Sequence, residues 1–297
     1  MANKCIITGA TGYIGSHVLK HLLGKGWDVH IIADPRFGYD NIIDVLSQID
    51  VFEYEGNVNS LYDYFKRVNA CVVFHLAAAV ITNYKPEQVP VLIQSNVQFG
   101  TEILEAMRQS ETKLLVSTGS YWQNYNSDTY NPVDLYAATK EAFEKIVSYY
   151  VEAYGLRHIN LRLFDVYGED DKRPKLWNLL RNIAGTDQSI SVSPGEQLLD
   201  MIHISDVCTA YEHAYYALIE DVSLKNEIYG VRTGVLKSLK EIIELFEETL
   251  GSHINIEFGG KPYKEREVMI PCTSYNYIPG WSAKVGLLEG FKRFKNG

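Results

Sequence analysis

Several features are scarce or missing in this 297-residue sequence, and each absence excludes a class of protein. No apolar run approaches the roughly 20 residues that a membrane-spanning helix requires. The sequence has 28 basic and 37 acidic residues, and a net charge of −9 disfavours nucleic acid or an anionic membrane as a partner. No run of five basic residues occurs. We therefore expect no nucleic-acid binding and no membrane binding.

Cysteine is also scarce. The four cysteines stand at positions 5, 71, 208 and 272, without any C-x-x-C pair. This spacing fits neither a zinc site nor a disulfide framework. The first residues lead directly into an apolar run, without the layout of a secretory signal. We expect free thiols, no metal and a cytoplasmic location.

What the sequence does contain is the alternation typical of an α/β protein. Short apolar runs near 5–8, 29–32, 51–54, 71–75 and 113–117 alternate with helical patterns near 14–23, 60–67 and 90–109. This rhythm predicts a doubly wound parallel sheet with helices on both faces. After residue 165 the rhythm becomes irregular, with helical patterns near 175–184, 205–219, 238–250 and 283–294. We predict a first domain over 1–165, to which parts of 201–235 return, and a smaller mixed α/β substrate-binding lobe over 166–297.

A glycine-rich loop follows the first apolar run, in the segment Thr8-Gly9-Ala10-Thr11-Gly12-Tyr13-Ile14-Gly15. In such a loop Gly9 permits a tight turn, Gly12 lets the backbone approach a pyrophosphate, and Gly15 allows the helix to pack on the strand. The following helix offers free N–H groups and the positive end of its dipole to phosphates. The alternative is that the glycines only make turns. The position at the start of a β–α unit favours a Rossmann-type site for NAD or NADP, bound by Gly9, Thr11, Gly12, Tyr13, Ile14 and Gly15.

The choice between the two dinucleotides stays open at this point. Asp34 stands 19 residues after Gly15, where an acidic residue bonds the ribose hydroxyls of NAD and repels a 2′-phosphate. Arg36 follows closely and is suited to pair with the 2′-phosphate of NADP. Asp34 could also simply begin a turn with Pro35.

A second motif, Tyr136-Ala137-Ala138-Thr139-Lys140, opens a helix predicted over 135–154. The spacing of four places Tyr136 and Lys140 on one helix face. A tyrosine with its usual pKa near ~10 is a poor acid–base group at neutral pH, but a neighbouring ammonium and a cationic nicotinamide lower that pKa. A hydroxyl in the preceding strand end, Ser117 to Ser120, can bond the same substrate oxygen. An unrelated surface pair is the alternative, but the combination predicts a carbonyl–alcohol interconversion.

Together these motifs resemble the extended short-chain dehydrogenase/reductases, the NAD-dependent epimerase/dehydratase group that acts on nucleotide sugars. Further segments carry the resemblance: His75 to Ala78, Asn96 to Thr101, Leu161 to Gly168, Asp200 to Val207, and Pro279-Gly280-Trp281. The resemblance implies that Thr118, Tyr136 and Lys140 form the catalytic trio. It also implies a nucleotide-diphosphate sugar as the substrate, and a homodimer through the helices at 90–109 and 135–154.

The same resemblance assigns the remaining site residues. Beyond the glycine loop, the implied cofactor residues are Asp34, Arg36, Asn57, Val58, Leu76, Ala77, Ala78, Asn96, Tyr136, Lys140, Phe164 and Val166. The implied substrate residues are Thr118, Gly119, Ser120, Asp165, Lys175 and Arg266. Asn57 and Asp165 replace an aspartate and an asparagine that are usual in the family. We interpret His75 and His203 as core residues rather than metal ligands.

The residues after Thr118 narrow the reaction. Dehydratases of this family carry Asp-Glu there, whereas this chain has Gly119-Ser120 and thus no carboxyl group. Glycine also removes bulk, which we expect to admit a differently shaped sugar. The surrounding segments resemble the reductases of the family that complete CDP-3,6-dideoxyhexoses. We predict NAD(P)H-dependent reduction at C4 of a CDP-linked deoxy 4-keto sugar. The alternatives are an NAD-dependent 4-epimerase and, more remotely, a non-catalytic dinucleotide-sensing protein.

Overall fold

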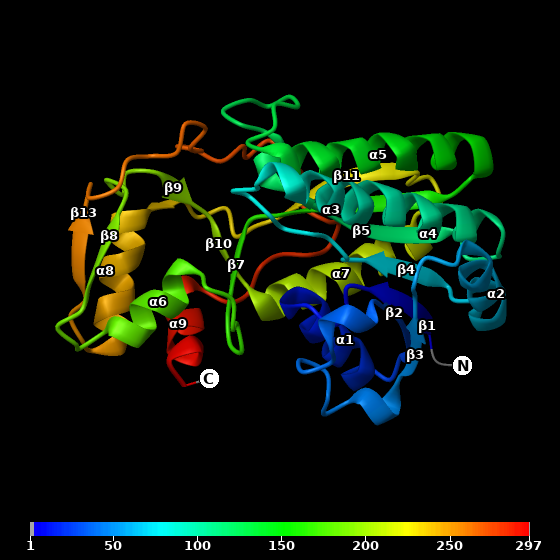
Figure 1. Ribbon diagram of the computed structural model, residues 1–297, viewed down its shortest axis with the longest axis horizontal. Coiled ribbons are helices and arrows are strands. Elements are labelled where there is room, and N and C mark those ends of the chain that lie inside the picture. The colour runs from blue at the N-terminus through cyan, green and yellow to red at the C-terminus, as the bar shows by residue number, and fades with distance from the viewer. Residues whose placement is uncertain (1–2, 297) are drawn as a thin grey trace.

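Seven parallel strands form the central sheet of the computed structural model, which describes residues 3–296 (Figure 1). Their order is β11-β6-β5-β4-β1-β2-β3. Their bounds are β1 (Lys4–Thr8), β2 (Asp28–Ala33), β3 (Asp50–Glu53), β4 (Val72–His75), β5 (Leu114–Ser120), β6 (Arg157–Leu163) and β11 (Asn226–Val231). The predicted Rossmann-type sheet is confirmed. Its strand order reverses between β1 and β4, and ligands of such sheets bind at the carboxyl ends of the strands beside this point.

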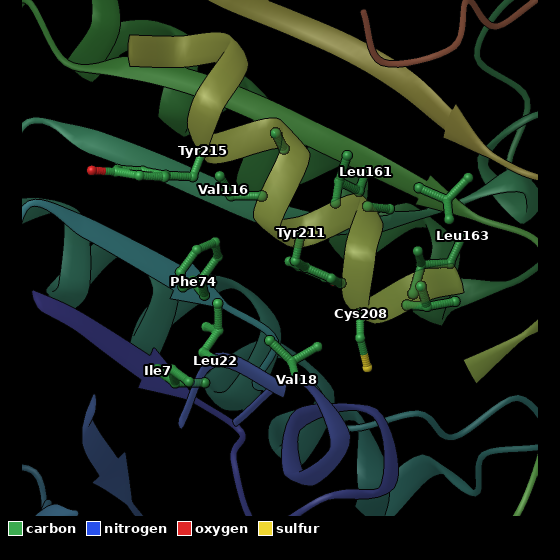
Figure 2. Packing of buried hydrophobic residues seen from close by; sticks show 14 of the residues in the cluster. Ile7, Val18, Leu22, Phe74, Val116, Leu161, Leu163, Cys208, Tyr211 and Tyr215 are labelled. Carbon is green, nitrogen blue, oxygen red and sulfur yellow. The ribbon is translucent and has the colours of Figure 1, made fainter. Parts of the chain in front are cut away.

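Helices cover both faces of the sheet, because its middle strands are apolar on both sides. On one face α1 (Tyr13–Gly24) packs with α7 (Ile204–Glu220), and Figure 2 shows Val18 and Leu22 in this layer with Tyr211 and Phe74. On the other face lie α2 (Val58–Val68), α4 (Phe99–Arg108) and α5 (Leu135–Tyr154). The helix predicted over 90–109 is instead α3 (Val89–Ile93), a π-helical turn (Gln94–Gln98) and α4.

A third apolar cluster holds the smaller lobe, which lies at one end of the molecule (Figure 1). Its helices are α6 (Leu176–Ile183), α8 (Leu239–Leu250) and α9 (Leu287–Asn296). Its strands form three pairs: β7 (Asp165–Tyr167) with β10 (Met201–His203), β9 (Leu198–Leu199) with β12 (Lys237–Ser238), and β8 (Ser189–Val192) with β13 (Asn255–Phe258).

The last helix begins later than the sequence pattern indicates. We predicted it over 283–294, but the backbone N–H groups of Lys284 and Val285 donate to the Asp206 carboxylate at 3.0 and 2.9 Å. These bonds tie the segment to α7, so the helix starts only at Leu287. Within residues 3–296, none of the helices is both long and apolar enough to cross a bilayer.

Candidate active site

The glycine loop between β1 and α1 needs glycine at two of its three positions. Gly9 has φ +75°, and a Cβ there would lie 2.5 Å from the backbone nitrogen of Ala77. A Cβ on Gly15 would lie 2.1 Å from the Gly9 carbonyl oxygen. Gly12 is the N-cap residue of α1 and has no side chain that could accept from the first N–H groups of the helix. These N–H groups can therefore bind an anion. The loop therefore fits a dinucleotide pyrophosphate.

The neighbouring strand end supports this loop. Thr8 Oγ1 lies 2.8 Å from Nδ1 of His75 and accepts a bond from the Ala77 backbone N–H at 3.3 Å. Burial lowers the pKa of His75 to about 3, so its imidazole is neutral at physiological pH. His75 and His203 are 2% and 1% exposed, as expected of core residues.

The two residues that favour different dinucleotides bind each other in this structure. Asp34 accepts bonds from the backbone N–H and the Nε of Arg36 at 3.0 and 2.8 Å. The Arg36 guanidinium holds the pKa of the Asp34 carboxyl below its usual value. Asn57 caps α2 by accepting from the backbone N–H groups of Asn59 and Ser60. Contacts of these side chains with a cofactor stay predictions, as do those of Val58, Leu76 and Ala78.

Asn96 fixes the loop after β4. Its side chain accepts from the Ala79 N–H at 2.7 Å, donates to the Ala79 carbonyl at 3.0 Å and donates to Thr139 Oγ1 at 2.9 Å. It therefore joins this loop to the helix that carries Tyr136 and Lys140. Phe164 and Val166, which flank Asp165 after β6, are buried.

Thr118 stands near the carboxyl end of β5. Its hydroxyl donates to the His75 carbonyl at 3.1 Å and lies 2.5 Å from the hydroxyl of Tyr211 on α7. Sequence reasoning did not single out Tyr211, because nothing in the local pattern of α7 indicates contact with a strand end 93 positions away.

Tyr136 and Lys140 lie in the first two turns of α5, whose N-cap Asp134 accepts from the Ala137 N–H at 2.8 Å. Both side chains are buried. Burial raises the pKa of Tyr136 above its usual value, and Asp134 adds to the rise. Burial outweighs the charge of Arg162, which lowers this pKa, and the lowering that we expect from Lys140 stays a prediction. The effect of a bound nicotinamide cation stays a prediction.

Lys140 is less basic than an exposed lysine. Burial lowers its pKa to about 8, although the Glu144 carboxylate opposes this change. The charge of Lys140 also depresses the pKa of His75, and the charge of Tyr136 raises that of Tyr211, the partner of Thr118. These influences link Lys140 to His75 and Tyr136 to Tyr211, and both His75 and Tyr211 contact Thr118. That Thr118, Tyr136 and Lys140 act as a catalytic trio stays a prediction.

The glycine after Thr118 is explained by packing. A Cβ on Gly119 would lie 2.2 Å from Oδ1 of Asn160 and 2.6 Å from Nη1 of Arg162, both on β6. The missing side chain thus faces β6, and our expectation that it makes room for a sugar is wrong.

A buried network that sequence reasoning missed surrounds this position. Arg162 pairs with Glu141 and Glu144 of α5 and donates to Gln123. The Gln123 Oε1 atom also accepts from the Ser120 N–H at 3.0 Å, so the network braces the strand end. Ser120 Oγ accepts from the Trp122 N–H at 3.2 Å.

Asp165 and Lys175 are close enough to influence each other. Burial raises the pKa of Asp165 to about 6, and the Lys175 ammonium opposes the rise. Burial likewise lowers the pKa of Lys175, whose Nζ lies 3.5 Å from the Val166 carbonyl. The Tyr121 hydroxyl donates to Asp165 at 3.0 Å.

Arg266 is held in place rather than solvated among neighbouring charges. Its Nε donates to the Pro132 carbonyl at 3.1 Å and its Nη2 donates to Asn131 at 2.6 Å. Its guanidinium lies 4.2 Å from the ring centroid of Tyr125. These contacts place Arg266 against the loop that leads into α5.

Three features define a dinucleotide-binding oxidoreductase fold. They are a parallel sheet whose strand order reverses between β1 and β4, a glycine loop suited to phosphates, and a Tyr–Lys pair at the start of α5. The model of the NAD dependent epimerase/dehydratase family matches residues 5–229. The chain belongs to this family and is an enzyme of the extended short-chain dehydrogenase/reductase type, which sets aside the non-catalytic alternative.

Individual proteins resemble the chain over almost its whole length. A CDP-abequose synthase from Salmonella muenchen is 28% identical over 295 residues, covering 98% of this chain and 96% of that protein. A putative UDP-glucose 4-epimerase from Methanocaldococcus jannaschii is 27% identical over 312 residues, covering 98% and 97%. The solved UDP-glucose 4-epimerase from Thermotoga maritima has a TM-score of 0.85 at 21% identity, covering 99% and 97%, and shares the fold.

Proposed function

We propose that this protein uses NAD(P)H to reduce the C4 carbonyl of a CDP-linked deoxy 4-keto sugar to an alcohol. The observation that carries the proposal is a buried, protonated Tyr136 in the first turn of α5, in a chain where Thr118 of β5 is followed by glycine and serine. Such a site has a proton donor for the C4 oxygen. It lacks, at positions 119 and 120, the carboxyl side chains that eliminate water in the family's dehydratases.

The residues divide the chemistry as follows. Thr118 donates a hydrogen bond to the C4 oxygen and fixes its orientation. When bound, the reduced nicotinamide supplies a hydride to C4. As the C–H bond forms and the carbonyl π bond breaks, Tyr136 gives its proton to the C4 oxygen. The Lys140 ammonium stabilises the phenolate that remains, which solvent reprotonates.

The substrate class is supported by likeness and by charge. Relatives whose names state that they are CDP-abequose synthases match almost the whole chain. Arg266 and Lys175 supply cations for a diphosphate, and a guanidinium suits this ligand because of its forked geometry. Remote binding of the nucleotide would hold the sugar in a reactive orientation.

We also propose a homodimer and a reducing, cytoplasmic setting. Val91, Ile93, Tyr149 and Tyr154 on α3 and α5 are 39–57% exposed, and burying such apolar groups against a second copy would be favourable. All four cysteines, which lie within the described part of the chain, are free thiols.

The second candidate is a 4-epimerase that uses the same trio with NAD retained throughout. It is favoured by the UDP-glucose 4-epimerases among the relatives. Purified protein should be mixed with NADH or NADPH and a CDP-linked 4-keto-deoxy sugar. Reduction gives a loss of reduced-nicotinamide absorbance equal to the product formed. Turnover of UDP-glucose without net cofactor change would instead support epimerisation.

A further inference from the structure

A second hydroxyl lies directly behind Thr118. Tyr211 projects from α7 into the apolar layer against the sheet, where its ring packs edge-on to Phe74 with centroids 6.2 Å apart (Figure 2). The residue has 0% exposure. Its hydroxyl lies 2.5 Å from Thr118 Oγ1. A buried hydroxyl needs a hydrogen-bond partner, and among the described residues Thr118 is that partner.

The direction of this bond follows from counting hydrogens. The Thr118 hydroxyl carries one hydrogen, and the His75 carbonyl 3.1 Å away can only accept it. With its hydrogen committed there, Thr118 can only accept the bond from Tyr211. The hydroxyls thus form a chain in which Tyr211 donates to Thr118 and Thr118 donates to His75.

We propose that Tyr211 is a positioning residue that fills the acceptor side of Thr118 and thereby presents Thr118 to the substrate as a hydrogen-bond donor. The inference rests on the proposed function, because it requires a C4 oxygen beside Thr118. When that oxygen arrives, the Thr118 hydrogen turns from the His75 carbonyl to the substrate while the bond from Tyr211 remains.

The arrangement suits a ketone. A carbonyl oxygen accepts hydrogen bonds but cannot donate them, so a Thr118 hydroxyl held as a donor is complementary to it. A hydroxyl whose oxygen accepts a bond also donates a stronger one, by about 10–30% of the bond's strength. The Tyr211 hydroxyl keeps its proton throughout, because burial and the nearby charge of an ionised Tyr136 both disfavour its ionisation.

A double-mutant cycle tests this role. Tyr211→Phe removes one buried hydroxyl and keeps the ring. With the CDP-linked 4-keto sugar, we expect kcat to fall about tenfold and KM to change by less than about twofold. In a Thr118→Val background, where there is no hydroxyl to orient, the same change should alter kcat by less than about twofold. Equal factors in both backgrounds would overturn the proposal.

Two further variants separate positioning from general damage. Tyr215→Phe removes a buried phenol hydroxyl one turn further along α7, whose bond runs to Asn3 at 3.4 Å, and should leave kcat unchanged. Thr118→Ser keeps a hydroxyl, so its activity should still fall when Tyr211 becomes phenylalanine. Loss of that dependence in Thr118→Ser would count against the proposal.

Urea unfolding provides a readout without substrate. If wild type turns over no CDP-linked 4-keto sugar, the proposed function fails, and this cycle still decides whether Tyr211 holds the Thr118 hydroxyl. Tyr211→Phe should lower the unfolding midpoint in the wild-type background, because a buried bond is lost. In the Thr118→Val background it should raise the midpoint, because it removes a buried hydroxyl left without a partner. The same shift in both backgrounds would show that the bond does not exist.

Discussion

Gly119 and Arg162 occupy adjacent strands so closely that a Cβ on the glycine would lie 2.6 Å from the guanidinium Nη1. Arg162 is buried and cannot yield cheaply, since it pairs with Glu144 and Glu141. Packing against β6 therefore requires glycine at position 119, where the family's dehydratases carry a carboxyl residue.

Gly119→Ala should consequently destabilise the protein. We expect a loss of about 1–3 kcal/mol in unfolding free energy, as for other overpacked cores. The matched control is Gly24→Ala at the end of α1, where a Cβ meets nothing within 4 Å. Denaturant unfolding of both variants gives the comparison. If both variants matched wild type, the contact between Gly119 and Arg162 would not constrain the strand end.

Tyr136→Phe should abolish most of the turnover while leaving the fold intact. Loss of a general acid reduces kcat by about 10²–10⁴-fold. The hydroxyl of Tyr216 on α7, which is 38% exposed and outside the proposed dimer surface, serves as the control through Tyr216→Phe. Steady-state kinetics with circular dichroism of both proteins makes the test. Comparable activity in the two variants would remove Tyr136 from the mechanism.

Lys140→Met should lower the activity and raise the unfolding free energy, and the gain in unfolding free energy should depend on pH. Folding lowers the pKa of Lys140 from 10.5 to about 8, so below pH 8 the folded state carries the full cost of a buried ammonium, about 3 kcal/mol. That cost fades as pH rises from about 8 to 10.5, where the folded residue is already neutral. The variant should therefore be more stable than wild type at pH 7 and gain nothing above pH 10.5. Equal stability at pH 7 would mean that Lys140 is not buried as an ammonium.

Asp165→Asn should also stabilise the protein, with its own pH window. Burial raises the folded pKa of Asp165 from 3.8 to about 6, so its ionised form costs about 3 kcal/mol above pH 6 and nothing below pH 3.8. Unfolding at pH 7 and pH 3.5 should show the gain only at the higher pH. Asp221→Asn should act in the opposite direction, because bonds from Ser223 lower the pKa of Asp221. A gain from Asp165→Asn at both pH values would contradict the burial of its charge.

The pairing of Asp34 with Arg36 leads to a prediction about cofactor preference. Asp34→Ala frees the Arg36 guanidinium and removes a carboxylate that repels a 2′-phosphate. Binding of NADPH relative to NADH should improve about tenfold, equivalent to roughly 1.4 kcal/mol. Arg36→Ala should shift the ratio the other way. Fluorescence titration with both nucleotides measures the ratio, and no change in either variant would place this pair outside the cofactor site.

The main sheet could be predicted from the sequence because the residue patterns that specify it lie within short segments of the chain. Apolar runs set the strands, and the glycine spacing at Gly9 and Gly15 reflects contacts within one β–α unit. The four-residue step from Tyr136 to Lys140 needs only helical geometry. These features therefore indicated the fold class and the region of the site.

What the sequence could not show depends on tertiary contacts. The hydroxyl of Tyr211 reaches Thr118 only because α7 crosses β5. Whether the pKa of Tyr136 rises or falls depends on how completely the start of α5 is buried. The role of Gly119 is set by side chains of another strand. The strand pairs of the lobe were not predicted, because they join short segments that lie far apart in the chain, such as β8 and β13.

Isotope transfer tests the central claim most directly. The protein should be incubated with nicotinamide nucleotide carrying deuterium at the transferable position of its reduced ring, together with the CDP-linked 4-keto-deoxy sugar. We expect one deuterium at C4 of the product for each cofactor oxidised, and incorporation about 10²–10⁴-fold slower with Tyr136→Phe. A product without deuterium, formed while the reduced cofactor remains, would contradict reduction at C4.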